Sequence, residues 1–290
     1  MSGAESTSVA VNPVNKMVLD IVIPAAGKGR RLGGAIPKQY LDINGRPLLA
    51  HTLERLQRIN PRRVILVVSE DDNFWRDVPG VENCEIAFGG DSRANSVLNG
   101  LLALDTGTAS LTPDWVLVHD AARPCVKVSD IARLIAAVGE HEVGGILGVK
   151  IVETVKHLTG PAEDQVRAMD IHQTLDREQL WLAQTPQLFR RGLLKQALTQ
   201  GLAKAPSPAT NSPGNKSLDL ISGLITDESS ALENMGYSPL MVEGSKDNIK
   251  VTTAEDLELA AFFLRKQLNV EKHGASRQAQ TNSNPGGATH

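Results

Sequence analysis

A buried strand that runs into a glycine-containing, cationic loop constrains the fold of this chain more than any other feature. Residues 18–24 are mostly apolar and β-branched, and Ala25-Ala26-Gly27-Lys28-Gly29-Arg30-Arg31 follows them. Such a run is typical of a strand inside a parallel sheet. Gly27 and Gly29 let the backbone approach a ligand closely, and the basic side chains add positive charge. The segment predicts a phosphate-binding turn at the end of a strand.

Two common glycine loops match this segment poorly. In a Walker loop Gly-Lys is followed by Ser or Thr, whereas Gly27-Lys28 is followed by Gly29. The dinucleotide fingerprint would need its third glycine one position before Gly33. It also needs an acidic residue roughly 20 positions on, and the next convincing strand (63–69) ends about twice too late for that spacing. A nicotinamide-dependent oxidoreductase is therefore disfavoured, and a structural turn with solvated cations is the simplest alternative.

Strand-like and helix-like segments alternate up to about residue 150. The predicted strands are 19–23, 64–69, 85–88, 115–119 and 145–149, and the predicted helices are 48–56, 92–104 and 131–138. Ser129 is the expected N-cap of the third helix. This alternation predicts an α/β fold with a doubly wound, mostly parallel, Rossmann-like sheet and helices on both faces.

The pattern changes after residue 150. Residues 149–158, 165–174 and 180–185 are strand-like with few helices between them, which predicts an antiparallel excursion from the main sheet. Residues 204–223 are dominated by Pro, Ser, Asn and Gly, so we expect a flexible insertion there.

The C-terminal part returns to helix and strand. We expect a helix at 225–235, a strand at 237–243, and a capping box at Thr253–Asp256 that opens a last helix to about Leu268. Residues 1–16 form an aperiodic leader, and the polar residues 271–290 are expected to be disordered. The predicted organisation is one domain over residues 17–268.

Composition excludes several classes of function. The chain has 290 residues, a formal net charge of −3 and 3% aromatic residues, which argues against nucleic-acid binding. No apolar run approaches the roughly 20 residues of a membrane helix. Cys84 and Cys125 are far apart and form no CxxC pair, so a reducing cytoplasm is the expected compartment.

Polar residues follow several predicted strands, at the edge where parallel sheets bind their ligands. These candidates are Lys38, the segment Gly89-Gly90-Asp91-Ser92-Arg93, Asp120 with Arg123 shortly after it, and Lys250. Each also has a simpler interpretation, as a helix cap, a turn residue or a solvated lysine. Because all fall at one predicted edge, the cations and the strand-end aspartate together favour a Mg²⁺-bound nucleoside triphosphate. His119 precedes Asp120 on the strand, points to the opposite face and is expected to face the core.

The motifs resemble the 2-C-methyl-D-erythritol 4-phosphate cytidylyltransferase family of the non-mevalonate isoprenoid pathway. The matching segments are PAAGKGRRLGG, PKQY, GGDSRANSV, VLVHDAARP, ETVK, TLDR, AQTPQLF, ITDESSALE and VEGSKDNIKVTTAEDL. They occur in the family's order over about residues 18–265. The first of them alone would indicate only the wider nucleotidyltransferase superfamily, whereas the whole set is specific.

The resemblance implies transfer of CMP from CTP to 2-C-methyl-D-erythritol 4-phosphate, with release of pyrophosphate and with Mg²⁺ as cofactor. It implies that Arg31 and Lys38 stabilise the transition state. Asp120 is also a tentative Mg²⁺ ligand, with the metal held mainly by the triphosphate. The residues implied in nucleotide binding are Pro24, Ala25, Ala26, Gly27, Gly29, Arg30, Gly90, Asp91, Ser96, Asp120 and Ala121.

For the second substrate, the resemblance implies contacts from Thr154, Arg177, Thr226 and Lys250, with Arg177 and Lys250 positioning its phosphate. It also implies that residues 150–180 form a β-arm that interlocks two subunits in a homodimer, so that Thr154 and Arg177 reach the partner's site. Two alternatives stay open: a cytidylyltransferase that acts on ribitol 5-phosphate, and a non-catalytic nucleotide-binding homologue. The TLDR and DNIKVT segments favour methylerythritol phosphate.

Overall fold

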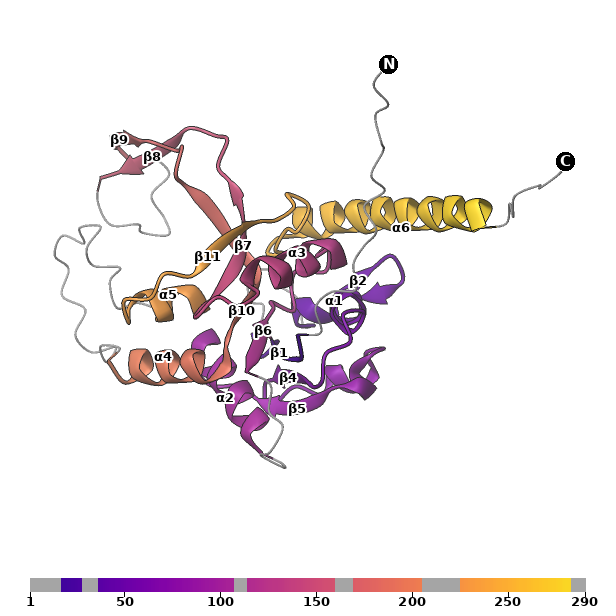
Figure 1. The fold of residues 1–290 in the computed structure, drawn as a ribbon, viewed down its shortest axis with the longest axis horizontal. Coiled ribbons are helices and arrows are strands. Elements are labelled where there is room, and N and C mark those ends of the chain that lie inside the picture. Colours follow the sequence, from indigo (N-terminus) through magenta and orange to yellow (C-terminus); the bar gives the residue numbers. More distant parts are fainter. Residues whose placement is uncertain (1–16, 28–35, 107–113, 160–168, 205–224, 283–290) are drawn as a thin grey trace, which may run out of the picture.

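The central feature is a seven-stranded sheet, shown with its flanking helices in Figure 1. The computed structural model describes residues 17–27, 36–106, 114–159, 169–204 and 225–282. The expected leader at 1–16 and nearly all of the expected insertion at 204–223 lie outside these residues. In spatial order the strands are β11 (Leu240–Glu243), β7 (Gly144–Lys150), β10 (Trp181–Arg190), β6 (Trp115–Val118), β1 (Leu19–Pro24), β4 (Val64–Val68) and β5 (Glu85–Phe88).

The sheet is mostly parallel, as the alternating pattern predicts. β1 pairs in parallel with β4 and with β6, and β4 pairs in parallel with β5. β10 runs antiparallel to both of its neighbours, β6 and β7. The predicted segment 180–185 is therefore the start of a central strand that continues to Arg190.

Helices cover both faces of the sheet. They are α1 (Leu48–Gln57), α2 (Arg93–Asp105), α3 (Val128–Val138), α4 (Arg191–Lys204), α5 (Glu228–Glu233) and α6 (Ala254–Asn282). Short elements connect them: η2 (Lys38–Tyr40), β2 (Asp42–Ile43), β3 (Arg46–Pro47), η3 (Phe74–Asp77) and η4 (Val81–Asn83). Most of the buried apolar side chains of α1 and those of α3 join one core cluster, and those of α2, α4 and α5 join another. Leu48 of α1 belongs to a third, smaller cluster with Ala260 and Leu264 of α6.

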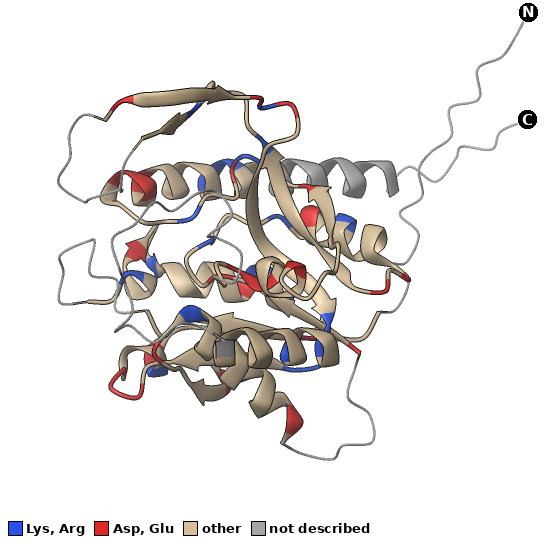
Figure 2. Ribbon diagram, turned by 90° about the vertical axis from the view of Figure 1, so that its left-hand side faces the viewer, with Lys and Arg blue, Asp and Glu red and all other residues tan. Residues whose placement is uncertain are grey.

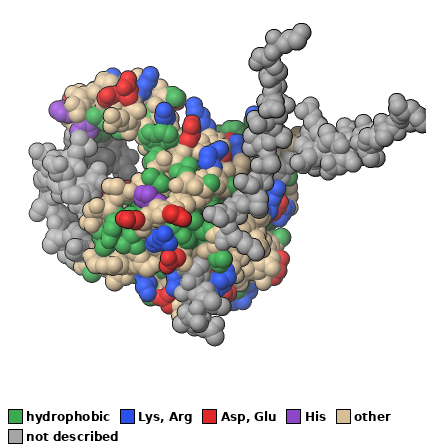
Figure 3. Space-filling view, viewed as in Figure 1, with side chains coloured by type: hydrophobic (Ala, Val, Ile, Leu, Met, Phe, Trp, Pro, Cys, Tyr) green, Lys and Arg blue, Asp and Glu red, His purple; other side chains and the backbone are tan. Residues whose placement is uncertain are grey.

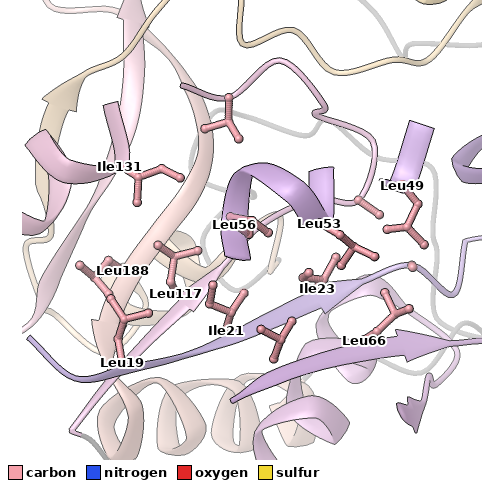
Figure 4. Close-up of a cluster of buried hydrophobic side chains, with 14 of the residues drawn as sticks. Leu19, Ile21, Ile23, Leu49, Leu53, Leu56, Leu66, Leu117, Ile131 and Leu188 are labelled. Atoms are coloured by element: carbon pink, nitrogen blue, oxygen red, sulfur yellow. The ribbon is translucent and has the colours of Figure 1, made fainter. Parts of the chain in front are cut away.

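Alternation along the strands sends successive side chains to these two clusters. Ile21 and Ile23 of β1 face α1, where they meet Leu53 and Leu56 (Figure 4). Val22, between them, packs on the opposite face in the cluster of α2 and α4. Each of these side chains is fully buried. Burial of such an aliphatic side chain stabilises the fold by roughly 1.5–3 kcal/mol, so the site edge of β1 is held rigidly from both sides.

A separate two-stranded antiparallel hairpin, β8 (Val155–Leu158) and β9 (Ile171–Leu175), stands apart from the central sheet at the upper left of Figure 1. The antiparallel excursion is thus present, but the strand expected at 149–158 is divided. β7 ends at Lys150, and β8 begins only at Val155. Part of the strand expected at 165–174 lies outside the described residues.

Two helix boundaries differ from the sequence predictions. α3 begins at Val128 with Lys127 as its extended N-cap residue, so the expected cap Ser129 already lies in the first turn. α6 opens at the predicted capping box, where the Thr253 hydroxyl accepts from the Asp256 amide and the Asp256 carboxylate accepts from the Thr253 amide. It continues to Asn282 instead of ending near Leu268.

The helix therefore covers residues 271–282, which we expected to be disordered. Good helix formers such as Ala, Gln, Lys and Glu continue past Leu268. The first proline after the helix begins is Pro285, beyond its end. The apolar periodicity ends near Leu268, but the helix continues to Asn282, so the end of that periodicity does not mark the end of α6.

Acidic and basic residues are interspersed along the described elements in Figure 2, in keeping with the small net charge. Within the residues that the structure describes, no helix is both long enough and apolar enough to cross a membrane.

Candidate active site

A cavity of about 820 Å³ opens at the carboxyl edge of the parallel strands. The segments that follow β1, β4, β5 and β6 line it, and Lys250 closes one side. Ligands of open α/β sheets bind at this edge. The predicted site residues that line it are Pro24, Ala25, Ala26, Gly27, Lys38, Gly90, Asp91, Ser96, Asp120, Ala121 and Lys250.

Three predicted residues, Gly29, Arg30 and Arg31, lie outside the described part of the chain. Thr154, Arg177 and Thr226 are described and exposed, and none of them is among the residues lining the cavity. The Arg177 guanidinium instead donates to the Val152 carbonyl at the base of the hairpin. Within one chain, the structure therefore brings together the described members of the predicted nucleotide set with Lys38 and Lys250. It leaves Thr154, Arg177 and Thr226 outside the cavity lining.

The cavity floor is formed where the first loop meets α2 without space for a side chain. A Cβ atom on Gly89 would lie 2.4 Å from Ala26 Cβ and 2.8 Å from Ser96 Oγ. Ser96 Oγ accepts from the Gly90 amide at 3.3 Å and donates to the Ser92 carbonyl at 2.9 Å. Only glycine at position 89 lets these two segments touch, so the backbone itself forms the floor.

The N-terminus of α2 also faces the cavity. Ser92 is its N-cap, and its hydroxyl accepts from the Asn95 amide at 3.1 Å. The helix is 13 residues long and presents its positive dipole end to this space. Together with the glycine backbone, it makes the cavity suitable for an anion.

Lys38 is placed by its neighbours in η2. Its ammonium donates to the Val251 carbonyl at 3.0 Å, which joins the first loop region to the chain beside Lys250. Gln39 is buried and donates to the Ala25 carbonyl at 2.8 Å, and Tyr40 donates to Asp72 at 2.6 Å. Burial first and the Asp72 carboxylate second raise the pKa of Tyr40 well above its ordinary value, so it remains a donor. These contacts hold the Lys38 ammonium at the cavity wall.

Asp120, directly after β6, is surrounded by three cations. Its Oδ1 accepts from Arg93 Nε at 2.8 Å, its Oδ2 accepts from Lys250 Nζ at 2.7 Å, and Arg123 Nε lies 3.9 Å from Oδ2. Burial alone would raise the pKa of Asp120, but Arg93 and Lys250 outweigh it and hold the pKa well below its ordinary value. Asp120 therefore stays ionised.

Arg93 is shared between two carboxylates. Its Nη1 and Nη2 atoms donate to Glu228 Oε1 and Oε2 at 2.7 and 3.0 Å, while its Nε serves Asp120. Burial opposes the charge on Arg93, but Glu228 and Asp120 hold its pKa above the ordinary value. Sequence reasoning placed Arg93 at this edge without a role of its own and did not single out Glu228. The position of Arg93 beside the N-cap Ser92 was an available signal, whereas nothing in the sequence pairs it with Glu228.

His119, a neutral histidine, is linked through Thr185 to the backbone amide of Asp120. Because His119 Nε2 must donate to the Arg123 carbonyl at 3.1 Å, its Nδ1 accepts from the Thr185 hydroxyl at 3.1 Å. Thr185 Oγ1 in turn accepts from the Asp120 amide at 3.0 Å. Burial lowers the pKa of His119 to about 4. The prediction that His119 faces the protein interior is confirmed by its complete burial.

The described residues contain no group of three or more His, Cys, Asp or Glu side chains that could hold a metal ion. Asp120 contributes a single carboxylate. Such a donor set fits a Mg²⁺ ion that a bound triphosphate largely coordinates, and does not fit a metal held by protein ligands alone.

The chain matches one protein-family model over residues 19–266, and that model describes 2-C-methyl-D-erythritol 4-phosphate cytidylyltransferases. It is 38% identical over 265 residues to an enzyme of that name from Hahella chejuensis, covering 90% of this chain and 99% of the relative. It is 42% identical over 248 residues to one from Chromobacterium violaceum, covering 84% and 96%.

Solved structures agree with these sequence matches. A 4-diphosphocytidyl-2C-methyl-D-erythritol synthase structure superimposes with a TM-score of 0.65 at 34% identity, over 86% of this chain and 99% of that chain. The cytidylyltransferase of Francisella tularensis gives a TM-score of 0.63 at 34% identity, over 85% and 99%.

Because His119 is buried in its neutral form, we expect the folded protein to lose stability in acid. Its pKa is about 4 in the folded protein and 6.5 in an unfolded chain, so between these values the unfolded state binds the extra proton. The free energy of unfolding should fall by roughly 1–3 kcal/mol as the pH drops from 6.5 towards 4. Urea denaturation of wild type and His119→Asn at several pH values measures this, and the variant should lose that part of the slope.

The matched control is His172→Asn, which removes an exposed histidine of the hairpin. Its pH dependence should follow the wild type. An identical slope in wild type and His119→Asn would contradict the neutral, buried state of His119.

Proposed function

The chain belongs to the 2-C-methyl-D-erythritol 4-phosphate cytidylyltransferase family, and we propose that the cavity at the carboxyl edge of the sheet is its active site. It is a cytidylyltransferase enzyme, which transfers CMP from CTP to 2-C-methyl-D-erythritol 4-phosphate in isoprenoid precursor biosynthesis. One observation supports the proposal most strongly: positions from Pro24 to Lys250, far apart in the sequence, line the same cavity.

The cavity offers the triphosphate several kinds of support. The backbone of Ala25, Ala26 and Gly27 lies along one wall, and the N-terminus of α2 faces the same space. Gly90, Asp91 and Ser96 form the region that we assign to the cytosine and ribose. Gly29, Arg30 and Arg31 would complete the loop around the phosphates, as the family resemblance implies.

The reaction is an in-line displacement at the α-phosphorus of CTP. A phosphate oxygen of the second substrate forms the new P–O bond, and the bond from the α-phosphorus to the bridging oxygen breaks, so that pyrophosphate leaves with the electron pair. The attacking oxygen is already anionic and needs no general base. Catalysis then depends on orientation and on stabilising the negative charge of the transition state. We assign that stabilisation to Lys38 and Arg31.

Lys250 and Asp120 lie at the side of the cavity where the second substrate would enter. The Lys250 ammonium is bonded to Asp120, yet its side chain remains 40% exposed. It is therefore placed to contact the incoming phosphate, with Arg177, Thr154 and Thr226 as the further contacts implied by the family.

Mg²⁺ would enter with the triphosphate, and Asp120 would supply one carboxylate to it. When bound, the ion neutralises charge on the phosphates. The residues around Asp120 keep that carboxylate ionised and fixed in place.

A homodimer would explain the exposed apolar side chains of the hairpin and its base. Val152, Leu158, Ile171 and Leu182 are 52%, 41%, 60% and 56% exposed. Figure 3 shows acidic, basic and histidine side chains beside apolar ones in this region, at the upper left. Apolar surface with a polar surround is typical of a protein–protein interface. In such a dimer Arg177 and Thr154 of this chain would reach the cavity of the partner, as the family resemblance implies.

We place the reaction in the cytoplasm. Cys84 and Cys125 are both free thiols, and no disulfide links the described residues. Unpaired cysteines are typical of a reducing compartment.

Pyrophosphate release tests the function directly. Purified protein with Mg²⁺ would receive CTP, UTP, ATP or GTP, each with methylerythritol phosphate and then with ribitol 5-phosphate. We expect release with CTP and methylerythritol phosphate. Release with ribitol 5-phosphate instead would preserve the fold and chemistry and overturn the substrate. No release with any pair would indicate a nucleotide-binding protein without this activity.

Lys38→Ala should separate transition-state stabilisation from nucleotide binding. Because the charge acts mainly as the α-phosphorus is attacked, we expect kcat to fall by about 100-fold or more while the Kd for CTP changes by less than about tenfold. Steady-state kinetics and calorimetry measure the two quantities. Lys195→Ala is the control, since this lysine of α4 pairs with Asp105 at the C-terminal end of α2, whereas the N-terminal end of α2 lines the cavity. Wild-type turnover in Lys38→Ala would refute the assigned role.

A site shared between subunits predicts complementation. Arg177→Ala should raise the KM for methylerythritol phosphate, and Lys38→Ala should lower kcat by about 100-fold or more. At a low concentration of methylerythritol phosphate both variants are therefore nearly inactive. When they are mixed and allowed to exchange subunits, some dimers contain one site with neither substitution, and activity should return to about a quarter of wild type or less. Absence of recovery, with exchange verified by mass spectrometry of labelled chains, would place each site within one chain.

A further inference from the structure

A continuous set of ion pairs connects the cavity to a carboxylate outside it. Lys250 bonds to one oxygen of Asp120, Arg93 bonds to the other, and Arg93 then bonds to both oxygens of Glu228. Asp120, Arg93 and Lys250 line the cavity, whereas Glu228 does not. Its side chain is 0% exposed. No contact with substrate is therefore available to Glu228, and its effect on the reaction must pass through Arg93.

Glu228 is fixed more firmly than a surface carboxylate. It is the first residue of α5, where a negative charge is favoured by the helix dipole. Asp227 caps this helix by accepting from the Ser230 amide at 2.9 Å. The buried Gln187 of β10 donates to Asp227 at 2.8 Å and accepts from the Ser229 amide at 3.0 Å. The helix start, and with it Glu228, is thus anchored to the central sheet.

The geometry at Arg93 depends on this anchor. With Glu228 holding the Nη1–Nη2 end of the guanidinium, Arg93 meets Asp120 through Nε, which donates to Oδ1. Oδ2 stays available to Lys250. Without the Glu228 charge, the Arg93 guanidinium could turn to contact both oxygens of Asp120. A bidentate arginine is a stronger partner for a carboxylate than a single lysine ammonium, so Lys250 would lose its place.

We infer that Glu228 is a positioning residue for cytidylyl transfer, which restrains Arg93 so that Asp120 can hold the Lys250 ammonium at the cavity. This inference rests on the proposed role of Lys250 in binding the second substrate. If Glu228 acts in this way, its loss should impair the use of the polyol phosphate more than the use of CTP. The contacts along the triphosphate involve the first loop and α2, while the loss of Lys250 affects the polyol phosphate.

Glu228→Gln tests the inference, because the amide keeps the size of the side chain and removes its charge. We expect kcat/KM for methylerythritol phosphate to fall by about 10- to 100-fold, and the KM for CTP to change by less than about threefold. Initial rates with each substrate varied in turn measure both. Circular dichroism and urea denaturation identify a temperature at which the variant is fully folded.

Asp20→Asn is the matched control. Asp20 is also a fully buried carboxylate in a bidentate pair, with Arg62 at 3.0 and 2.8 Å, but it lies at the opposite end of β1 from the cavity. Its loss should lower stability and leave the kinetic constants of the folded protein within about twofold of wild type. Kinetics of Glu228→Gln that match those of Asp20→Asn would overturn the inference.

Lys250→Met separates this inference from the proposed active site. If Glu228 acts through Lys250, adding Glu228→Gln to Lys250→Met should reduce kcat/KM by less than about twofold further. Wild-type kinetics in Lys250→Met would refute the proposed role of Lys250 in binding the second substrate. Impaired Lys250→Met with fully additive effects would refute only the positioning role of Glu228.

If Glu228→Gln does not fold, Glu228→Asp provides a second test with the negative charge kept. The side chain is one methylene shorter, so from its place in α5 it no longer holds both Nη atoms of Arg93, and the guanidinium is free to turn towards Asp120. The expected result is again a selective loss of kcat/KM for the polyol phosphate, and an unchanged value would overturn the inference.

Discussion

Parallel pairing of β1 with β4 and β6 is the constraint on which the rest of the structure depends. It brings the ends of these strands to one edge, and it makes three loops from residues 24–27, 69–71 and 120–122 walls of one cavity. Alternating burial on both faces of β1 fixes the strand between two cores. A parallel sheet needs both faces covered, and the helices that cover it also supply the α2 N-terminus and Arg93. Structural packing and ligand geometry are therefore consequences of the same arrangement.

The positive charges beside the cavity are paired with buried carboxylates. Arg93, Lys250 and Arg123 surround Asp120, and Glu228 offsets part of their positive charge. Buried ions are costly unless they are paired, and loss of one partner leaves the other charge uncompensated. The balance keeps the cations in defined positions before a nucleotide arrives. Preorganised charge of this kind requires little reorganisation during the reaction, which is how enzymes stabilise anionic transition states.

Much of the fold and of the cavity lining could be predicted from sequence because the relevant signals are local. The carboxyl ends of parallel strands meet at one edge of a sheet. Locating each strand and the residues after it therefore suffices to place Asp120 and Gly90 beside the first loop. The link from Arg93 to Glu228 could not be predicted, because 135 positions separate the two and only the docking of α5 against the sheet brings them together. No element was expected over α4, whose apolar residues continue directly from β10.

The place of β10 in the sheet has a consequence for how the chain folds. β7 precedes β10 in sequence, yet β10 lies between β6 and β7. The edge of β7 that will face β10 therefore has no neighbour until the chain has passed Trp181, while β1, β4, β5 and β6 already have one another. During synthesis β1, β4, β5 and β6 can pair early. β7 can join this sheet only after β10 has been made, because β10 lies between β6 and β7. Gln187 and Thr185 arrive with that strand, so the supports for α5 and Asp120 are among the last parts of the enzyme to be assembled.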